Sequence, residues 1–554
     1  MRGYEAFLST LEELDLTTIF GNPGSTEVPW LDELPRYEKL RFVLTLHESI
    51  AVNMADGYAQ ARRSPSVASV HASPGLLHSL GALYNAKIAG SPVIAIAGQV
   101  DSRILSRDPF LASDIVSAAK GYAKWTWELR RADEIRYVLR RAAKVAMDPP
   151  TGPVMISVPK DILDEEVKEN YPLPTDYRNM RSGFGGDDRS IQRAVELLLK
   201  AESPAMICGP EVRWYGAVDK CVKLAELLAM KVYDDIRYGV YYPVNHHCYF
   251  GFFTREDLKS HDLILVVGQR MFYEITREQI PLVGEGAELI HITSDPMELG
   301  KNYEASCCIF GDSATVMEKL LESCSKRLST ESEKLENRRK SLENHKKELL
   351  EYNRKELEEY FDRKPVSAHR VVNEVNRVFG DGDELNVVVE AVTSQPFIRR
   401  LMKSFNGYNY FVNPGATLGW GVAASVGVKL AEEDKKVLCF SGDGAFMYYP
   451  QSLWTAARVG VKVVVIVMNN RAYMNDKLHI QSRRGTSFRA GAYDAVEINN
   501  PPVTIEQIAK GIGCNAATVR DPGELSTALE LASSSSSSFV VDVHIDPSIV
   551  DRRR

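Results

Sequence analysis

Short apolar runs alternate with helical patterns along most of the chain. In its first part, amphipathic segments with a helical period separate apolar runs of strand length at residues 18–20, 42–46, 66–71, 93–97 and 154–158. Strands that alternate with helices are typical of a parallel, doubly wound sheet. We therefore predict an α/β domain over residues 1–164.

The same alternation recurs in the middle of the chain. A polar stretch at residues 165–189, which we interpret as a linker, precedes a second predicted α/β domain over 190–325. Its apolar runs lie at residues 204–208, 232–233, 263–267 and 289–292. Its loops carry no glycine-rich dinucleotide fingerprint, since the nearest candidate, Val267-Gly268-Gln269, has too few glycines.

The last third of the chain contains a connector and another α/β pattern. Glu, Lys, Arg and Asn dominate residues 326–364, where spaced leucines predict a charged helical connector with one apolar stripe. Residues 365–554 again alternate strands and helices. The predicted fold class is therefore α/β, with three doubly wound domains and mainly parallel sheets.

Polar groups follow two neighbouring strands of the last domain. A strand at residues 437–440 leads into Gly442-Asp443-Gly444, and a strand at 461–468 leads into Asn469-Asn470. Because ligands bind at the carboxyl edge of such sheets, Asp443 and Asn470 are expected side by side there. Carboxylate and amide oxygens suit Mg²⁺, and the glycines allow a phosphate to approach the backbone. A structural strand–helix–strand unit with glycine turns is the alternative.

In the first domain, Glu48 stands between an apolar strand and a helix rich in small residues. Partial burial is expected to raise the pKa of its carboxyl group, so that it could share a proton with a heterocycle nitrogen near neutral pH. Taken alone, however, Glu48 is better explained as an acidic residue favoured by the dipole at a helix N-terminus.

Composition excludes several classes of partner. The 554 residues are 44% hydrophobic and 25% charged, which is ordinary for a globular protein, and the net charge of −7 argues against nucleic acid or an anionic membrane as the main partner. No apolar run has the length of a membrane span, and the N-terminal pattern lacks the apolar core of a signal peptide. Eight scattered cysteines without a CxxC pair are expected to be reduced thiols of a cytoplasmic protein.

Several motifs together resemble one family. They are GNPGSTEVPWLDELP at 21–35, LHE at 46–48, DGYAQA at 56–61, SVHASPG at 69–75, SPVIAIAGQ at 91–99, TGPVMISVP at 151–159, NPGATLGWGVAASVG at 413–427, and the GDG and NN motifs. This set is similar to the thiamine diphosphate (ThDP)-dependent 2-oxoacid decarboxylase and acetolactate synthase family, and most similar to its benzoylformate decarboxylases.

The resemblance implies bound ThDP and Mg²⁺. It assigns a pyrimidine-binding role to the first domain, where Glu48 would bond the aminopyrimidine N1′, and a diphosphate-binding role to the third. The implied metal ligands are Asp443, Asn470 and the carbonyl of Ala472. Leu418 would hold the cofactor bent, and the remaining implied cofactor contacts are Thr393, Ser394, Gly444 and Ala445.

The implied reaction is non-oxidative decarboxylation of a 2-oxoacid to an aldehyde through a ylide and an enamine, with Ser25 and His71 contacting the substrate. The alternative is an acetolactate synthase-type carboligase that joins the enamine to a second carbonyl compound. The implied partners are a small 2-oxoacid and further copies of the chain. At least a homodimer, and usually a homotetramer, is expected, with active sites at the subunit interface.

Two segments depart from the benzoylformate decarboxylase pattern. Residues 267–275 contain no histidine where that family has one, so proton transfer is expected to differ or to pass through water or Glu274. Asn475 and His479 stand where apolar or aromatic residues are usual. A pocket lined by them is expected to suit a smaller or more polar oxoacid than benzoylformate.

Overall fold

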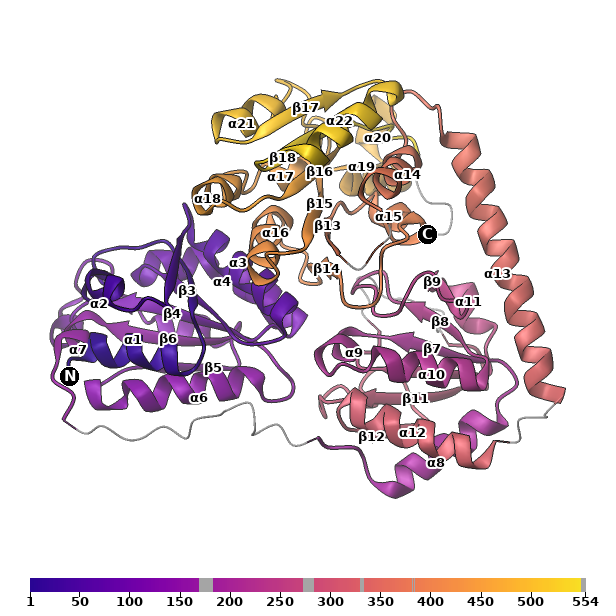
Figure 1. Cartoon of the computed structure of the whole chain (residues 1–554), viewed down its shortest axis with the longest axis horizontal. Coiled ribbons are helices and arrows are strands. Elements are labelled where there is room, and N and C mark those ends of the chain that lie inside the picture. The colour runs from indigo at the N-terminus through magenta and orange to yellow at the C-terminus, as the bar shows by residue number, and fades with distance from the viewer. Residues whose placement is uncertain (169–182, 273–282, 329–332, 381, 383, 550–554) are drawn as a thin grey trace.

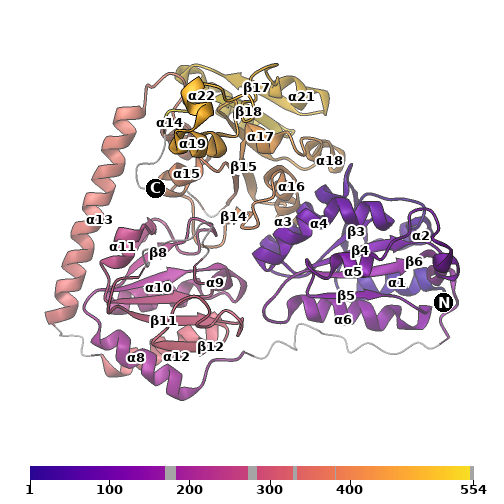
Figure 2. The ribbon, with the colours of Figure 1, turned by 180° about the vertical axis from the view of Figure 1, so that it is seen from behind.

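The computed structural model describes residues 1–168, 183–272, 283–328, 333–380, 382 and 384–549. Three six-stranded sheets form three lobes, which Figure 1 shows from one side and Figure 2 from behind. Every pair of neighbouring strands that the structure describes is parallel, from β1 with β2 (Thr18–Gly21 with Arg41–Leu44) onward. The predicted fold class is therefore confirmed, while the domain boundaries stay predictions.

The first sheet has the strand order β2-β1-β3-β4-β6-β5. Its inner strands are buried on both faces, which explains why they are continuous apolar runs rather than alternating ones. Beyond β1 and β2, its strands are β3 (Ser66–Val70), β4 (Val93–Gln99), β5 (Trp125–Glu128) and β6 (Val154–Pro159). Its helices are α1 (Gly3–Glu13), α2 (Val28–Glu33), α3 (Glu48–Arg62), α4 (Ala72–Ala89), α5 (Ile115–Ala119), α6 (Ile135–Met147) and α7 (Lys160–Asp164).

The central sheet is wound differently, in the order β12-β11-β10-β7-β8-β9, which is the order of dinucleotide-binding sheets. Its strands are β7 (Pro204–Cys208), β8 (Lys231–Asp234), β9 (Tyr249–Phe252), β10 (Leu263–Val267), β11 (Glu288–Thr293) and β12 (Cys307–Phe310). Its helices are α8 (Asp188–Lys200), α9 (Pro210–Trp214), α10 (Val218–Leu228), α11 (Arg255–Lys259) and α12 (Ser313–Arg327).

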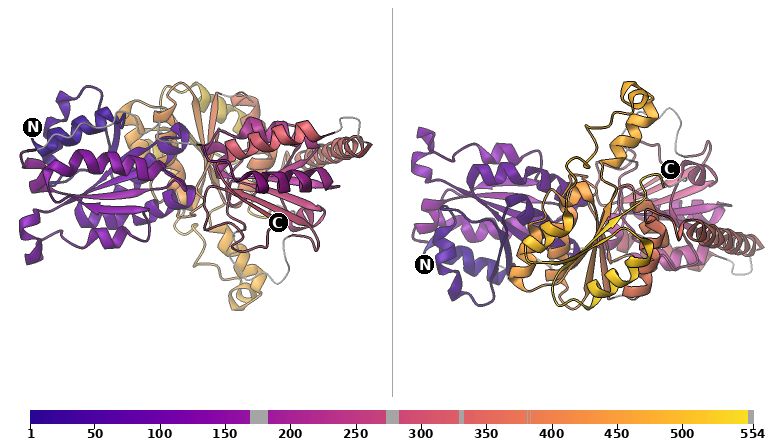
Figure 3. Two further views of the ribbon diagram at one scale, coloured as in Figure 1. Left: turned by 90° about the horizontal axis from the view of Figure 1, so that it is seen from below. Right: turned by 90° about the horizontal axis from the view of Figure 1, so that it is seen from above.

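The third sheet has the order β14-β13-β15-β16-β18-β17, which repeats the winding of the first sheet. Its strands are β13 (Leu385–Glu390), β14 (Tyr410–Val412), β15 (Lys436–Gly442), β16 (Val464–Asn469), β17 (Asn515–Val519) and β18 (Phe539–His544). Its helices are α14 (Ala368–Phe379), α15 (Gln395–Leu401), α16 (Trp420–Ala431), α17 (Asp443–Phe446), α18 (Ser452–Val459), α19 (Met474–Arg483), α20 (Thr486–Ala490), α21 (Ile505–Gly511) and α22 (Pro522–Ser534). Figure 3 shows the orange-yellow segment with α19 and α20 standing out from the body.

A single long helix, α13 (Glu333–Tyr360), forms most of the predicted connector and runs along the outer side of the central and third lobes (Figure 1). Its basic side chains bond carbonyl groups at or just after the ends of central-domain helices. Arg338 donates to the carbonyls of Leu228 and Glu202, and Lys334 donates to that of Lys200. The contacts to Leu228 and Lys200 satisfy carbonyl groups that have no partner within their own helices.

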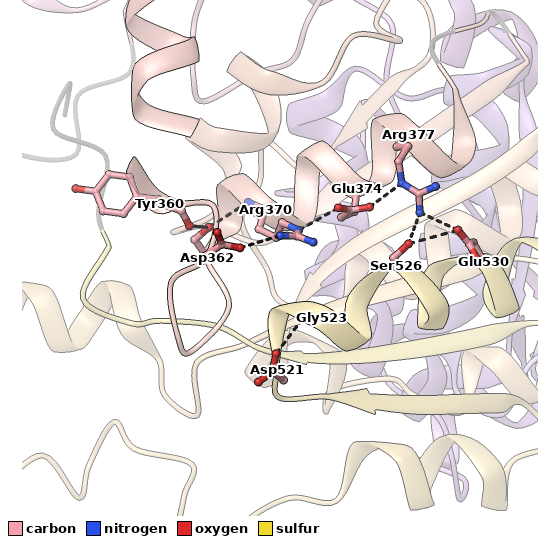
Figure 4. Close-up of polar contacts among 10 residues, drawn as sticks. Tyr360, Asp362, Arg370, Glu374, Arg377, Asp521, Gly523, Ser526 and Glu530 are labelled. Carbon is pink, nitrogen blue, oxygen red and sulfur yellow. Dashed lines mark hydrogen bonds and ion pairs between the residues drawn. The ribbon is translucent and has the colours of Figure 1, made fainter. Parts of the chain in front are cut away.

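Beyond α13, charged side chains join α14 to α22 (Figure 4). Arg370 pairs with Asp362 at 3.4 Å and with Glu374 at 3.0 Å, and Arg377 pairs with Glu374 and Glu530, both at 2.8 Å. These ion pairs hold α14, the first helix of the third domain, against α22, its last helix.

The first and third domains meet where α3 packs against α16. A Cβ atom on Gly57 would lie 2.4 Å from the carbonyl oxygen of Ala424, and one on Gly427 would lie 2.0 Å from that of Met54. Glycine on each helix therefore lets the other backbone approach. Helix α3 follows β2 and helix α16 follows β14. These two strands hold the same place in the first and third sheets, so equivalent helices of the two domains pack against each other.

Buried polar groups tie the central domain to the same junction. The indole N–H of Trp420 donates to Asp56 at 2.7 Å, and Gln60 donates to the other oxygen of Asp56 at 2.9 Å. Arg213, only 3% exposed, donates to the Gln60 side chain and to the carbonyl of Tyr410, both at 2.9 Å. One guanidinium thus binds all three domains together.

Among the described residues, no helix combines the length and apolar character needed to cross a bilayer. All eight cysteines are free thiols; Cys308 is half-buried and the others are buried.

We predict that Gly427→Ala lowers the apparent melting temperature, because the new methyl group would meet the Met54 backbone, which cannot move aside as a side chain can. Overpacking of this kind costs about 1–3 kcal/mol or more. Gly511→Ala is the matched control, since a Cβ there meets nothing within 4 Å. Equal melting temperatures for Gly427→Ala and the wild type would contradict the close contact of α3 and α16.

Candidate functional site

A cavity of about 1480 Å³ opens at the carboxyl edge of the third sheet. It lies beyond the ends of β13, β15 and β16, and α4 and the central domain also contribute to its wall. All the C-terminal residues singled out from the sequence line it: Thr393, Ser394, Leu418, Asp443, Gly444, Ala445, Asn470, Ala472, Asn475 and His479. The edge predicted from the GDG and NN motifs is therefore a single hollow site.

Asp443 is the first residue of α17 and only 5% exposed. Burial raises the pKa of its carboxyl group to about 6, although backbone N–H groups of Asp443, Gly444 and Asn470 oppose the shift. A carboxylate that is desolvated in this way is stabilised by a cation placed next to it.

The two asparagines of the NN motif have different surroundings. Asn469 is buried and donates its amide N–H to Asp542 at 2.8 Å, which ties β16 to β18. Asn470 lines the cavity, and its side-chain oxygen accepts the N–H of Ala472 at 3.1 Å. Arg471, which lies between Asn470 and Ala472, has a φ of 60°. This tight turn brings both of its neighbours to the cavity.

Glu390 also lines the cavity, although it was not among the residues predicted from the sequence. It ends β13, and its two carboxyl oxygens accept the N–H groups of Trp420 at 3.2 Å and Gly421 at 2.7 Å, at the start of α16. Burial raises its pKa to about 7 against these hydrogen bonds. No motif marks Glu390; an acidic residue that ends an apolar strand was the only available signal.

Asn475 and His479 lie one turn apart on α19 and both line the cavity. Asn475 is half-buried and His479 is exposed. Helix α19, part of the segment that projects from the body, therefore contributes their polar groups to the cavity wall.

Glu48 occupies a second place, at the start of α3 in the first domain, where it is 7% exposed. Asn22 donates to one carboxylate oxygen at 3.0 Å, and His78 lies 3.3 Å from the other. The expected upward pKa shift is wrong for this chain. Burial raises the pKa, but the hydrogen bonds from Asn22, from the Glu48 backbone and from His78 outweigh it, so the pKa is lowered.

Two histidines flank Glu48. His47 caps α3 by accepting the N–H of Ser49 at 3.1 Å, and its ring stacks on that of His78 with centroids 5.1 Å apart. Burial lowers the pKa of His47 despite the nearby Glu48 carboxylate. His78 was missed, although it lies seven residues after His71 on α4, a spacing that places both on one helix face.

His71 lies beside a buried acidic partner, Glu27, which was not singled out. The His71 Nδ1 is 2.9 Å from Glu27 Oε2, and this hydrogen bond raises the pKa of His71 against its burial. A Cβ on Gly24 would lie 2.0 Å from the ring, so only glycine fits there. Ser25 is exposed in the same turn.

The surroundings of Glu48 and the Asp443 cavity are separate within one chain. Glu48, Ser25 and His71, all described by the structure, are not among the residues that line the cavity with Asp443. They gather instead where β1, β2 and β3 end. Of the stretch without histidine, residues 267–272 are described, whereas Glu274 lies outside the described residues.

We predict that Glu390→Gln becomes more stable relative to the wild type as the pH rises from about 5 to 8. The folded pKa of about 7 exceeds the usual 4.5, so the folded wild type holds a proton that the unfolded chain has released. Wild-type stability therefore falls over this window, by about 3 kcal/mol at 1.36 kcal/mol per pKa unit, and levels off above it. Glutamine does not titrate.

The measurement is the difference in apparent melting temperature between variant and wild type at a series of pH values. Glu384→Gln, at an exposed position near the other end of β13, is the control and should show a constant difference. A constant difference for Glu390→Gln as well would show that this carboxyl group is not desolvated.

Comparison with known proteins covers all three domains. Models described as the N-terminal TPP (thiamine pyrophosphate) binding domain, the central domain and the C-terminal TPP binding domain of thiamine pyrophosphate enzymes match residues 1–126, 191–320 and 391–543.

Full-length relatives agree with these matches. A "Probable acetolactate synthase large subunit" of Methanococcus aeolicus is 27% identical over 99% of this chain and 92% of its own length. The benzoylformate decarboxylase of Pseudomonas aeruginosa is 29% identical over 98% of both chains. The structure of the ThDP-dependent 4-hydroxybenzoylformate decarboxylase of Rhodococcus jostii RHA1 is 25% identical, with a TM-score of 0.84 over 99% of this chain and 100% of that one. The resemblance seen in the motifs is confirmed, and the chain belongs to the thiamine pyrophosphate enzyme family.

Proposed function

We propose that this chain is a ThDP- and Mg²⁺-dependent enzyme that decarboxylates a 2-oxoacid to an aldehyde without oxidation. The observation that carries the proposal is the gathering of Asp443, Asn470 and Ala472 in one cavity at the edge of a parallel sheet. The family relationship supports a cofactor of this class, and the residues support the place where it binds.

The cavity residues fit the metal and the diphosphate. Asp443 is a desolvated carboxylate with a pKa of about 6, which a cation would stabilise, and it would hold Mg²⁺ with Asn470 and the Ala472 carbonyl. A Cβ at Gly442 would meet nothing closer than the Glu390 carbonyl at 3.9 Å, so the backbone can be approached there.

The remaining proposed cofactor contacts lie on the same wall. Thr393 and Ser394 come from the loop between β13 and α15, Gly444 and Ala445 from α17, and Leu418 from the turn before α16. The hydroxyl and N–H groups would bind diphosphate oxygens, and Leu418 would support the bent shape of the cofactor. When bound, ThDP supplies the carbanion and the electron sink for decarboxylation.

Glu48 would hold a proton at the pyrimidine N1′. Its lowered pKa in the free chain keeps it anionic, and a carboxylate held by Asn22 is oriented for such a bond. Ser25 and His71 would orient the substrate carboxylate and carbonyl. Glu27 would act through His71, because its hydrogen bond favours the protonated ring.

Two copies of the chain would be needed for one active site. Glu48 and the Asp443 cavity are separate within a chain, so a partner's Glu-bearing domain would complete each cavity. We propose a homodimer as the minimum and a homotetramer as the usual state. A cytoplasmic location is part of the proposal, in keeping with eight free cysteines.

The substrate and the fate of the product are the open part of the proposal. Asn475 and His479 in the cavity wall favour a smaller or more polar oxoacid than benzoylformate, since a buried unpaired amide costs about 1–3 kcal/mol beside an apolar group. Carboligation is the second candidate, because the acetolactate synthase relative spans 99% of the chain.

We predict that purified enzyme with ThDP and Mg²⁺ releases CO₂ from pyruvate or polar 2-oxoacids with a higher kcat/KM than from benzoylformate. The measurement is a panel of 2-oxoacids with both CO₂ and product recorded. Acetaldehyde from pyruvate identifies a decarboxylase, and acetolactate a carboligase. Omission of Mg²⁺ or ThDP is the control.

A preference for benzoylformate by orders of magnitude would contradict the role given to Asn475 and His479. The absence of CO₂ release from every acid of the panel would overturn the proposed reaction.

A further inference from the structure

Glu48 and its two flanking histidines form a compact cluster of metal-binding side chains. Among the described residues, one ligand atom each from His47, Glu48 and His78 lies within 4.8 Å of the others. The cluster joins two segments, the start of α3 and the face of α4. It is distinct from the Asp443 cavity, none of whose lining residues belongs to it.

The spacing of two of these groups matches a tetrahedral metal site. His78 Nδ1 lies 3.3 Å from Glu48 Oε2. Ligand atoms about 2.0–2.1 Å from a tetrahedral zinc ion are themselves about 3.3 Å apart. An ion between the two groups therefore needs little movement of either side chain. A ligand atom of His47 lies within 4.8 Å of both, and His47 becomes a third ligand when its ring turns away from the Ser49 N–H that its Nδ1 accepts.

The cluster is held in place before any ion arrives. The Asn22 amide holds Glu48 Oε1 at 3.0 Å, so Oε2 faces His78. A Cβ on Gly75 would lie 3.0 Å from Glu48, which shows how tightly the α4 backbone restricts this side chain. The His78 side chain is 57% exposed, so an ion can enter and water can complete its coordination.

The ligand types select the ion. Two imidazoles and one carboxylate suit Zn²⁺, Co²⁺ and similar divalent transition metals, whereas Mg²⁺ requires oxygen ligands. We propose that His47, Glu48 and His78 form a binding site for a divalent transition-metal ion in the cofactor-free protein.

One consequence rests on the proposed function. If Glu48 also bonds the pyrimidine N1′, the metal ion and ThDP compete for the same carboxylate. Zn²⁺ would then slow the activation of the cofactor-free enzyme by ThDP, because it occupies the carboxylate that the cofactor needs, while Mg²⁺ would bind at the Asp443 site.

The test is titration of the full-length protein with Co²⁺ after removal of cofactor and metals by a chelator. We expect saturable binding of one ion per chain with visible d–d absorption from the bound Co²⁺. His78→Asn and His47→Asn should each raise the dissociation constant by more than about tenfold and remove the absorption, because each loses a coordinate bond. Asparagine at position 47 is a good helix N-cap, so the fold is retained.

The matched control is the double variant His246→Asn with His247→Asn. These residues form a second cluster with Cys248 in the central domain, and both ring nitrogens of His246 are bonded there, to Glu226 at 3.0 Å and to the Cys248 N–H at 3.2 Å, whereas His47 has such a bond at Nδ1 alone. The control should keep the absorption and affinity of the wild type. No visible absorption in the wild type, or absorption that survives in both His47→Asn and His78→Asn, would overturn the site.

Addition of ThDP and Mg²⁺ to the Co²⁺-loaded protein separates this proposal from the proposed function. Release of Co²⁺ supports both. Retention of Co²⁺ at a site that depends on His78 would support the metal site and contradict the role of Glu48 at the pyrimidine.

Discussion

The close contact between α3 and α16 is the constraint on which the rest of the structure depends. Glycines on both helices, Gly57 and Gly427, allow each to touch the backbone of the other. Glu48 begins α3, and the N-terminus of α16 is held by Glu390 in the Asp443 cavity. One helix pair therefore sets the orientation of both candidate sites, and Arg213 brings the central domain to the same junction.

The matching winding of the first and third sheets accounts for two candidate sites rather than one. In each sheet the order reverses beside the first strand, so that β1 meets β3 and β13 meets β15. Ligand sites form at such reversals. His71 follows β3 and Asp443 follows β15, in equivalent positions. The central sheet has another order, and its contribution at the cavity is wall residues such as Phe252 and Arg255.

Sequence patterns were sufficient where chemistry and spacing coincide. The GDG and NN motifs predicted neighbouring strand ends because parallel strands align their carboxyl edges, and Asp443 and Asn470 do share a cavity. Apolar runs predicted most strands to within a few residues, as for β7 and β10. The charged pattern of the connector predicted α13, whose basic residues find carbonyl partners only in the folded chain.

Other features depend on residues that are distant in sequence. The pKa of Glu48 is lowered because Asn22 and His78, from two other segments, bond its carboxylate. The partner of His71 is Glu27, which lies 44 residues away and carries no motif of its own. Glu390 is marked only by burial at a strand end. Pairings of this kind arise from packing, which local patterns do not encode.

Completion of each active site by a second chain is the central claim, and mixing two inactive variants tests it most directly. Glu48→Gln and Asp443→Asn, each purified as full-length protein, should both lack activity with ThDP and Mg²⁺. In a dimer containing one of each, one site pairs the intact Glu48 with the intact Asp443. After unfolding and refolding together in equal amounts, the mixture is therefore expected to recover about a quarter of wild-type activity. No recovery, with mixed dimers shown to form, would mean that both residues act within one chain and would contradict the account.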